Sequence, residues 1–326
     1  MPIASIIVPA FNVEDTLPAT LDALCAQTFR DVEIIVVNDG STDRTAAVLQ
    51  DYADRPQIKV ITQRNRGLAG ARNSGIAAAR GAFIGFCDAD DLWLPEKLAA
   101  HVAHLDSAPH IGVSYSGSSL IDDDGASLGI AQSPRLKNLT AAHIFKRNPI
   151  GNGSAPVIRR AVFDAIAHRP ASEKCRDWYF DETFRQSEDI ECWLRIALTT
   201  GWQFEGIDGH LTQYRISAGA LSSATDLQLA AWERMVAKLT RIAPAFFAKN
   251  TKAARAYQLR YLARRAISDK DTDRASDLIA QSVGASWVPF WEEPRKSLST
   301  IAAALVLRIA GPLAVDVLMA QRGGKA

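Results

Sequence analysis

The stretch "AFIGFCDADDLW", residues 82–93, passes from small and apolar residues directly into three acidic residues, Asp88, Asp90 and Asp91. A short apolar run bounded by polar residues is typical of a buried strand, so the acids stand where a strand gives way to a loop. Asp88 and Asp90 can face one crevice, where carboxylates bind Mg²⁺ or Mn²⁺ together with substrate phosphates. Capping a helix that begins near Leu94 needs only one acid, so we predict that Asp91 caps it and that Asp88 and Asp90 contact a ligand.

Three similar apolar runs precede this one. They read "ASIIVPA", "VEIIVV" and "IKVIT", and segments with helical spacing at 14–27, 42–53 and 67–80 separate the four runs. Strands that alternate with helices predict a parallel sheet with crossover helices, and the ligand site of such a sheet forms at the carboxyl ends of its strands. Here those ends read "PAFN", "NDGSTD", "QRNRG" and "CDADD", and each is rich in polar residues, Gly or Pro.

The composition indicates a globular protein with more than one domain. The chain has 326 residues, 48% of them hydrophobic, and 37 basic residues nearly balance 36 acidic ones. This balance gives no electrostatic footprint for nucleic acid, so we expect no nucleic-acid partner. Four widely separated cysteines and an N-terminus without an export signal predict a cytoplasmic protein with reduced thiols.

Two common phosphate-binding motifs are absent. No GxGxxG follows the first predicted strand, and no GxxxxGK is followed by Ser or Thr. The sequence therefore does not support a dinucleotide oxidoreductase or a P-loop enzyme.

The pattern changes after residue 108. Strand-like runs alternate irregularly with loops, "DDDG" at 122–125 predicts a hairpin turn, and a helix is expected to start near Ser187. From about residue 226 apolar positions recur at helical spacing, and two antiparallel helices are predicted to join at "SDKDTD".

The segment "LSTIAAALVLRIAGPLAVDVLMAQ", residues 298–321, is the most membrane-like part of the chain. Arg308, Pro312 and Asp316 interrupt it before it is long enough to span a bilayer. We predict a packed terminal helix in preference to a helix that lies on a membrane surface, because its polar face is not rich in Lys and Arg. Peripheral membrane contact through the C-terminal helices remains the open alternative.

Five motifs in order carry a family resemblance. They are "SIIVPAFN", "IIVVNDGSTDRT", "NRGLAGARNSGI", "FIGFCDADDLWLPEKL" and "SEDIECWLRI", and they cover roughly the first two-thirds of the chain. With them the chain resembles the second, very large family of nucleotide-sugar-dependent glycosyltransferases. The resemblance implies a Rossmann-like α/β fold, the A-type glycosyltransferase fold, with a mainly parallel central sheet and a C-terminal helical appendage. The expected catalytic domain covers 1–225, with a nucleotide-binding half at about 1–108 and an acceptor half at about 109–225, and the helical region covers 226–326.

The resemblance also implies residues that hold the donor. Asp39 would bind the nucleobase or ribose, Asp88 would lie near the ribose, and Asp90 would bind the Mn²⁺ or Mg²⁺ that bridges the diphosphate. Arg72 would contact the nucleotide, and the alternative is a surface helix arginine. The loop that walls the nucleotide would contain Pro9, Ala10 and Asn12.

The acid of the family's "ED" motif is Asp189 here, and the resemblance implies that it deprotonates the attacking hydroxyl. Ser187 can cap the helix, and Glu188 and Asp189 fall in its first turn, where the helix end favours the ionised carboxylate that a base must be. First-turn acids also stabilise helices without any catalytic role, so this alternative stands beside the base.

One motif departs from the family pattern. Many relatives carry Tyr-Arg-x-His after the "ED" helix as part of a closing lid, and here the segment reads "QYRISAGALSS". Tyr214 and Arg215 match, while Ser217 stands in the place of the His. Glu188 is a further candidate for the lid or the acceptor cleft. We also expect two residues near the acceptor: Trp93 could stack on a sugar or pack in the core, and Asn152 could bind a sugar or shape its loop.

The activity implied is metal-dependent inverting transfer of a hexosyl or N-acetylhexosaminyl group. The donor is expected to be a nucleotide-diphosphate sugar, UDP-linked, and the acceptor a hydroxyl of a glycan or lipid-linked molecule in cell-surface polysaccharide synthesis at the cytoplasmic face of a membrane. The alternative is a non-catalytic nucleotide-sugar-binding or scaffold protein that retains the fold.

Overall fold

The computed structural model describes residues 2–216 and 225–311, so Ser217 lies outside the described residues. The chain forms two compact units, one of Met1–Ala141 with Pro149–Ser217 and one of Ala142–Asn148 with Ala218–Ala326. We call them the α/β unit and the helical unit, because the strands of the described residues all belong to the first. Residues 142–148 thus belong to the helical unit, whereas the sequence-based division groups them with the acceptor half.

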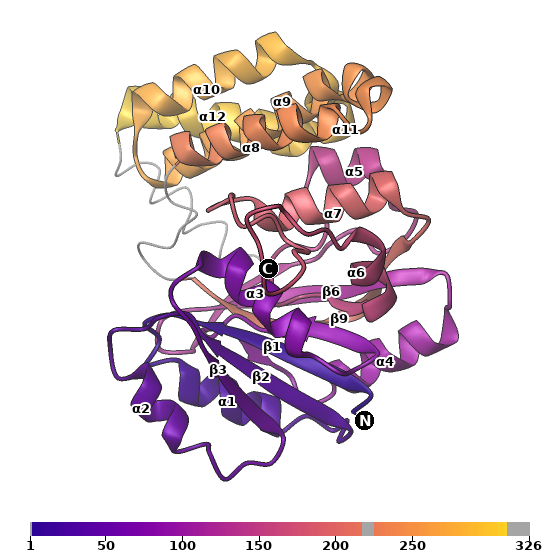
Figure 1. Cartoon of the computed structure of the whole chain (residues 1–326). Helices are drawn as coiled ribbons and strands as arrows, with labels where there is room; N and C mark the ends of the chain where they lie inside the picture. Colours follow the sequence, from indigo (N-terminus) through magenta and orange to yellow (C-terminus); the bar gives the residue numbers. More distant parts are fainter. Residues whose placement is uncertain (1, 217–224, 312–326) are drawn as a thin grey trace. The chain divides into compact units, whose positions relative to one another are not determined.

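One half of the central sheet consists of four parallel strands. They are β1 (Ala4–Ala10), β2 (Val32–Asn38), β3 (Ile58–Thr62) and β4 (Phe83–Phe86), in the order β3-β2-β1-β4. Their parallel pairing includes Val8 with Val36 and Ile7 with Phe86. The connecting helices are α1 (Leu17–Cys25), α2 (Thr45–Gln50) and α3 (Gly67–Ala78) (Figure 1). The predicted parallel sheet with crossover helices is confirmed.

The other half of the sheet is mixed. Its strands are β5 (Leu92–Trp93), β6 (Ile111–Ile121), β7 (Ser127–Gln132), β8 (Val157–Arg159) and β9 (Gln203–Arg215). Strand β8 runs antiparallel to both β4 and β6, and β9 runs parallel to β6. The described residues thus form one nine-stranded sheet in the order β3-β2-β1-β4-β8-β6-β9-β5, with β7 paired to β6. The helices in this second part of the α/β unit include α4 (Lys97–Ser107), α6 (Arg160–Ile166) and α7 (Glu188–Thr199).

The "DDDG" segment forms the hairpin turn between β6 and β7. The Asp122 carboxylate accepts hydrogen bonds from the backbone amides of Asp124 and Ala126 at 3.0 and 2.8 Å. Gly125 has φ of +83°, a left-handed conformation that favours glycine. These local bonds account for Asp122, and the turn interpretation is confirmed.

Close packing of α3 on β1 fixes the position of the helix that carries Arg72. Every residue of β1 is buried. A Cβ atom at Gly75 would lie only 2.3 Å from Cγ2 of Ile7, so a glycine is required where the helix meets the strand.

The helical unit contains α8 (Thr225–Thr240), α9 (Pro244–Ser268), α10 (Thr272–Ala285), α11 (Val288–Glu292) and α12 (Pro294–Ala310). Helices α9 and α10 form the predicted antiparallel pair, and the Ser282 hydroxyl donates to the Ala256 carbonyl across it at 2.7 Å. Helix α5 (Ala141–Lys146) contributes Phe145, whose ring stacks on Trp232 with 5.6 Å between centroids. This contact explains why residues 142–148 belong to the helical unit. No described helix is both long and apolar enough to cross a membrane.

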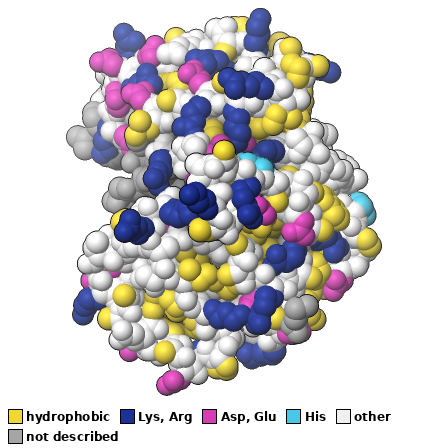
Figure 2. All heavy atoms as spheres, viewed as in Figure 1, with side chains coloured by type: hydrophobic (Ala, Val, Ile, Leu, Met, Phe, Trp, Pro, Cys, Tyr) yellow, Lys and Arg dark blue, Asp and Glu magenta, His cyan; other side chains and the backbone are white. Residues whose placement is uncertain are grey.

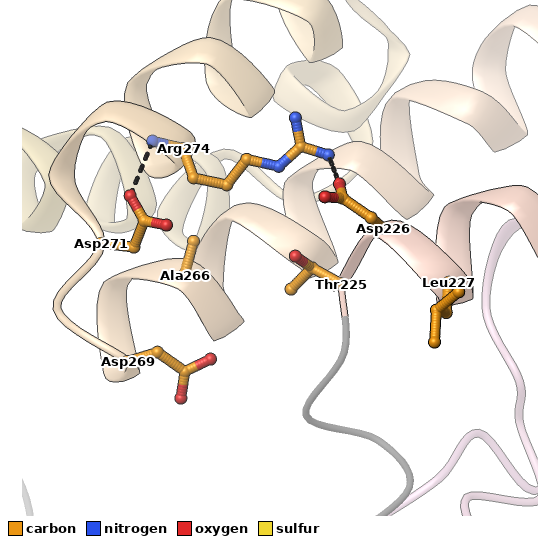
Figure 3. Close-up of a pocket in the computed structure, with 7 residues that line it drawn as sticks. All are labelled: Thr225, Asp226, Leu227, Ala266, Asp269, Asp271 and Arg274. Atoms are coloured by element: carbon orange, nitrogen blue, oxygen red, sulfur yellow. Dashed lines mark hydrogen bonds and ion pairs between the residues drawn. The ribbon is translucent and has the colours of Figure 1, made fainter.

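The helical unit also contains a cavity of about 300 Å³ where α8, α9 and α10 meet (Figure 3). Two of its three acids make contacts within the helical unit. Asp271 caps α10 by accepting from the Arg274 amide at 3.0 Å, and the Arg274 guanidinium pairs with Asp226. We interpret this cavity as a helix junction.

Candidate active site

The predicted binding loops lie together at one edge of the sheet, because β1 to β4 are adjacent and parallel. Pro9 and Ala10 are buried inside β1, so only Phe11 and Asn12 extend beyond it as an exposed loop. The Asn12 carboxamide accepts from the Thr42 amide at 2.8 Å and thereby ties the loop after β1 to the loop after β2.

Asp39 lies at this edge, directly after β2, and is 2% exposed. Its Oδ1 accepts hydrogen bonds from the Gln63 side chain at 2.6 Å and from the Arg66 amide at 2.9 Å. Gln63 in turn accepts from the Ser74 hydroxyl at 2.5 Å. One oxygen of Asp39 is therefore held in place by the segment after β3 and by helix α3.

Arg72 joins three motifs of the site. Its Nη2 donates to Asp88 Oδ1 at 2.9 Å and its Nη1 donates to Glu188 Oε1 at 3.0 Å. The guanidinium is 3% exposed and lies 5.5 Å from the centroid of the Phe180 ring. Burial disfavours its charge, but Asp88, Glu188 and Asp189 more than compensate and raise the pKa of Arg72. The residue is a buried cation, and the interpretation as a surface helix arginine is wrong.

Asp189 and Glu188 begin helix α7 beside this cation. Burial raises the pKa of Asp189 and Arg72 opposes the rise. Burial likewise raises the pKa of Glu188 to about 7. A carboxylate whose pKa is raised is a stronger base than an exposed one. Ser187 precedes them with φ of +62° and makes no side-chain cap hydrogen bond, so the predicted serine cap is wrong.

Asp88 and Asp90 follow β4, and both are partly exposed. Burial and the neighbouring Asp88 raise the pKa of Asp90 to about 6. A carboxylate whose pKa is raised by a neighbouring carboxylate favours a cation beside the two groups. Among the described residues no group of three or more His, Cys, Asp and Glu is arranged as a metal site. The carboxylates of Asp88 and Asp90 fit Mg²⁺ or Mn²⁺. These ions take one or two protein carboxylates and complete their coordination with phosphate oxygens and water.

Asp91 does not cap a helix. Helix α4 begins at Lys97, with Glu96 at its N-cap, and Asp91 is fully buried five residues before the cap. Its Oδ2 accepts from the Ser154 hydroxyl, and its Oδ1 accepts from the Arg215 amide at 2.9 Å. The residue therefore fastens two distant segments to the loop after β4.

Trp93 is a buried core residue and does not offer its ring to a sugar. It is 2% exposed, its ring packs on Gly85, and its Nε1 donates to the Ser154 carbonyl at 3.0 Å. The Lys97 ammonium lies 4.7 Å from its ring centroid. A sugar could not reach this ring without unfolding the loop, so stacking on an acceptor is wrong and the core interpretation holds.

The remaining candidates are mainly structural too. Asn152 is 6% exposed and donates to the Ser118 hydroxyl at 2.8 Å, so it shapes its loop. Tyr214 lies within β9, paired with Leu120 of β6. Arg215 donates from Nε to the Asp90 carbonyl at 2.8 Å and from Nη1 to the carbonyls of the hairpin turn. The Arg215 guanidinium thus links the loop that carries Asp90 to the hairpin turn.

The sequence analysis did not predict the contacts that hold the segment before α7 against helix α3. Arg66 pairs with Glu173 and with Glu182, and Asn73 donates to Glu182 at 2.9 Å. Asn73 also accepts from the backbone amides of Tyr179 and Phe180. These contacts hold the segment before α7 against α3. The "NRG" and "ARN" motifs contained two of the residues, but their partners lie more than 100 positions away.

Gly153 is a position where we expect a large effect from a small change. A Cβ there would lie 2.2 Å from Arg72 Nη2 and 2.9 Å from Asp88 Oδ2. Gly153→Ala should therefore separate this ion pair and lower the free energy of unfolding by about 1–3 kcal/mol, measured by urea denaturation. Gly201→Ala is the control, because nothing lies within 4 Å of its Cβ. Equal stability of the two variants would contradict the close approach.

Comparisons with known proteins identify the family of this chain. The family model of "Glycosyl transferase family 2" matches residues 5–167. The chain belongs to this family. The glucosyltransferase WfaP of Escherichia coli, "UDP-Glc:alpha-D-GlcNAc-diphosphoundecaprenol beta-1,3-glucosyltransferase", is 30% identical over 68% of this chain and 81% of its own length. "Uncharacterized glycosyltransferase EpsJ" of Bacillus subtilis is 53% identical, but over only 28% of this chain and 27% of its own length.

Solved structures of glycosyltransferases share the fold. S. aureus TarS 1-349 in complex with UDP-GlcNAc has a TM-score of 0.60 at 18% identity, covering 94% of this chain and 92% of that one. The mannosyltransferase PcManGT from Pyrobaculum calidifontis, in complex with GDP-Man and Mn²⁺, has a TM-score of 0.59 at 19% identity, covering 97% and 86%. This family 2 glycosyltransferase therefore has the A-type fold that its motifs predict, with additional helices in the C-terminal region.

Proposed function

We propose that this family 2 member is an inverting glycosyltransferase that moves a hexosyl or N-acetylhexosaminyl group from a UDP-sugar to a hydroxyl of a lipid-linked or glycan acceptor. The observation that carries the proposal is the pairing of Arg72 with both Asp88 and Glu188. This pairing brings together a nucleotide-binding motif, the acidic loop and the "ED" motif, which are separated by up to 116 positions in the chain.

Each residue has a role that its surroundings support. Asp39 is pre-positioned by Gln63 and by the Arg66 amide, so its second oxygen can accept from the nucleobase or ribose. Asp88, held by Arg72, contacts the ribose. Asp189 accepts the proton of the attacking hydroxyl, and the retained charge of Arg72 stabilises the carboxylate before the reaction.

Asp90 would hold Mn²⁺ or Mg²⁺, with Asp88 as its neighbour. When bound, such a cation neutralises charge that develops on the departing diphosphate. The chain itself orients Asp90 through its backbone carbonyl, which accepts from the Arg215 guanidinium at 2.8 Å. The Mn²⁺ in the related mannosyltransferase structure supports the choice of metal.

The acceptor and setting are suggested by relatives. WfaP and its E. coli counterpart WfgD are named for transfer to a diphosphoundecaprenol-linked GlcNAc. We infer a similar lipid-linked acceptor for this chain, in the synthesis of a cell-surface polysaccharide at the cytoplasmic face of a membrane. A non-catalytic nucleotide-sugar-binding protein is the rival, and the retention of the acids Asp39, Asp88, Asp90 and Asp189 argues against it.

A panel of UDP-, GDP- and dTDP-sugars tests the function. Purified protein is incubated with each donor and a diphosphoprenyl-linked sugar acceptor, with and without Mn²⁺, and release of nucleoside diphosphate is followed. Metal-stimulated turnover with a UDP-sugar is expected. Tight UDP binding with no turnover of any donor would favour the binding protein.

Metal binding should depend on pH through Asp90. Because the pKa of Asp90 is about 6, its carboxylate loses charge as pH falls through that value. We expect Mn²⁺ affinity in the presence of UDP, measured by electron paramagnetic resonance of the free ion, to fall about tenfold from pH 7 to pH 5. Asp90→Asn should bind Mn²⁺ weakly at both pH values. Tight binding by this variant would remove Asp90 from the metal site.

A further inference from the structure

Helix α12 has apolar side chains on two opposite faces. Its inward face is buried and consists mainly of small residues, namely Ser297, Thr300, Ala303, Ala304 and Leu307. The opposite face carries larger ones, Leu298, Leu305 and Ile309, which are 62%, 52% and 82% exposed. Spacings of seven and four residues align these three side chains along one side of the helix. The larger apolar stripe of α12 therefore points to solvent within the described part of the chain.

Two exposed tryptophans precede the stripe. Trp287 is 60% exposed and Trp291 is 82% exposed. Trp287 is the N-cap of helix α11 and Trp291 lies within it, and this helix is anchored, because Pro289 is buried and its carbonyl accepts from the Ser297 hydroxyl at 2.7 Å. The tryptophans are thus presented by a fixed backbone. Tryptophan side chains favour the boundary between water and the lipid headgroups, where the ring is apolar and its N–H stays hydrated.

Two positive charges flank the stripe. Arg295 at the start of α12 and Arg308 near its end are exposed, whereas Lys296, also exposed, pairs with Glu293 at 3.0 Å. Residues 226–326 contain 16 Lys and Arg against 9 Asp and Glu, whereas residues 1–225 contain 21 against 27. Figure 2 shows Lys and Arg side chains spread over the visible face of the helical unit. The near-neutral chain thus conceals a basic helical region, which an anionic surface would attract.

We propose that the outer face of α12, together with Trp287 and Trp291, docks on a membrane surface that contains anionic lipids. The apolar stripe would enter the headgroup boundary while Arg295 and Arg308 pair with lipid phosphates. A second copy of the chain fits this face less well, because a symmetric contact would bring basic residues of both copies together. The docking rests on α12 and not on the proposed reaction, although it would bring the enzyme to a lipid-linked acceptor.

Vesicle sedimentation tests the docking. Full-length protein is mixed with vesicles of phosphatidylcholine alone or with one-third phosphatidylglycerol, and the bound fraction is measured at low and high salt. We expect binding to the phosphatidylglycerol vesicles that weakens with salt. Leu305→Gln/Ile309→Gln should bind at least about tenfold more weakly, since Gln keeps helix propensity but removes apolar area. Arg295→Gln/Arg308→Gln should also bind about tenfold more weakly at low salt.

The matched control is Leu128→Gln/Ile130→Gln on strand β7, which removes two similarly exposed apolar side chains, 42% and 53%, from the α/β unit. This variant should bind like the parent, and circular dichroism melts should show that all variants are folded. The proposal is overturned if the parent does not bind vesicles, if both α12 variants bind as tightly as the parent, or if the parent is a dimer that Leu305→Gln/Ile309→Gln dissociates without vesicle binding. Vesicle binding that depends on α12, in a protein that turns over no donor, would refute the proposed function and leave the docking intact.

Discussion

Asp189→Asn should abolish most of the glycosyl transfer while the protein still folds and binds nucleotide. General bases contribute about 10²–10⁴-fold to rates, so we expect kcat to fall by this factor with a UDP-sugar and an acceptor. The substitution keeps the shape of the side chain, and Arg72 keeps its ion pairs with Asp88 and Glu188. UDP affinity, measured by calorimetry, should therefore change little.

The control separates catalysis from helix stabilisation. Asp273 is an exposed acid in the first turn of α10, so Asp273→Asn removes the same kind of charge from the same kind of helix position. It should leave kcat unchanged and cost about 0.3–1 kcal/mol of stability at most. If Asp189→Asn keeps parental kcat and shows only a similar stability loss, Asp189 is a first-turn acid and the base must be sought elsewhere.

Arg72→Gln should destabilise the whole α/β unit. Arg72 compensates three acidic groups in a buried site, and breaking a buried ion pair by removing one partner costs about 3–5 kcal/mol. We expect this loss in the free energy of unfolding at pH 8, measured by urea denaturation. Arg169→Gln is the control, because Arg169 pairs with Asp177 in an exposed bridge that should contribute about 0–1 kcal/mol.

The loss of unfolding free energy caused by Arg72→Gln should become smaller at low pH. In the parent, burial already raises the pKa of Glu188 to about 7, and Arg72 opposes that rise. Without Arg72 the pKa of Glu188 rises further, so the folded variant holds a proton that the unfolded chain releases. A raised acid pKa in the folded state means that stability falls as pH rises from the unfolded value toward the folded one. The deficit at pH 5.5 should therefore be smaller than at pH 8, and equal deficits would contradict the role of Arg72.

Local patterns predicted the first half of the sheet well. The runs that contain Val8, Val36 and Phe86 are continuous and apolar, and such runs become central parallel strands because both their faces are covered. The loops at their ends followed from the same argument, since parallel strands bring their carboxyl ends to one edge. Asp39, Asp88 and Asp90 follow strands that end at this edge, and Asp88 pairs there with Arg72.

The sequence alone determined the alternation of strands and helices, the family, and the acidic residues at the strand ends. Each of these follows from a local pattern of residues that are close together in the chain. Only the tertiary structure decided that Asp91 ties Ser154 and Arg215 together, that Trp93 is buried, and that Arg72 is a buried cation. Those side chains meet partners 61 to 124 positions away. A carboxylate or an indole has the same local pattern whether it faces solvent or such a partner, and only the folded chain brings the two together.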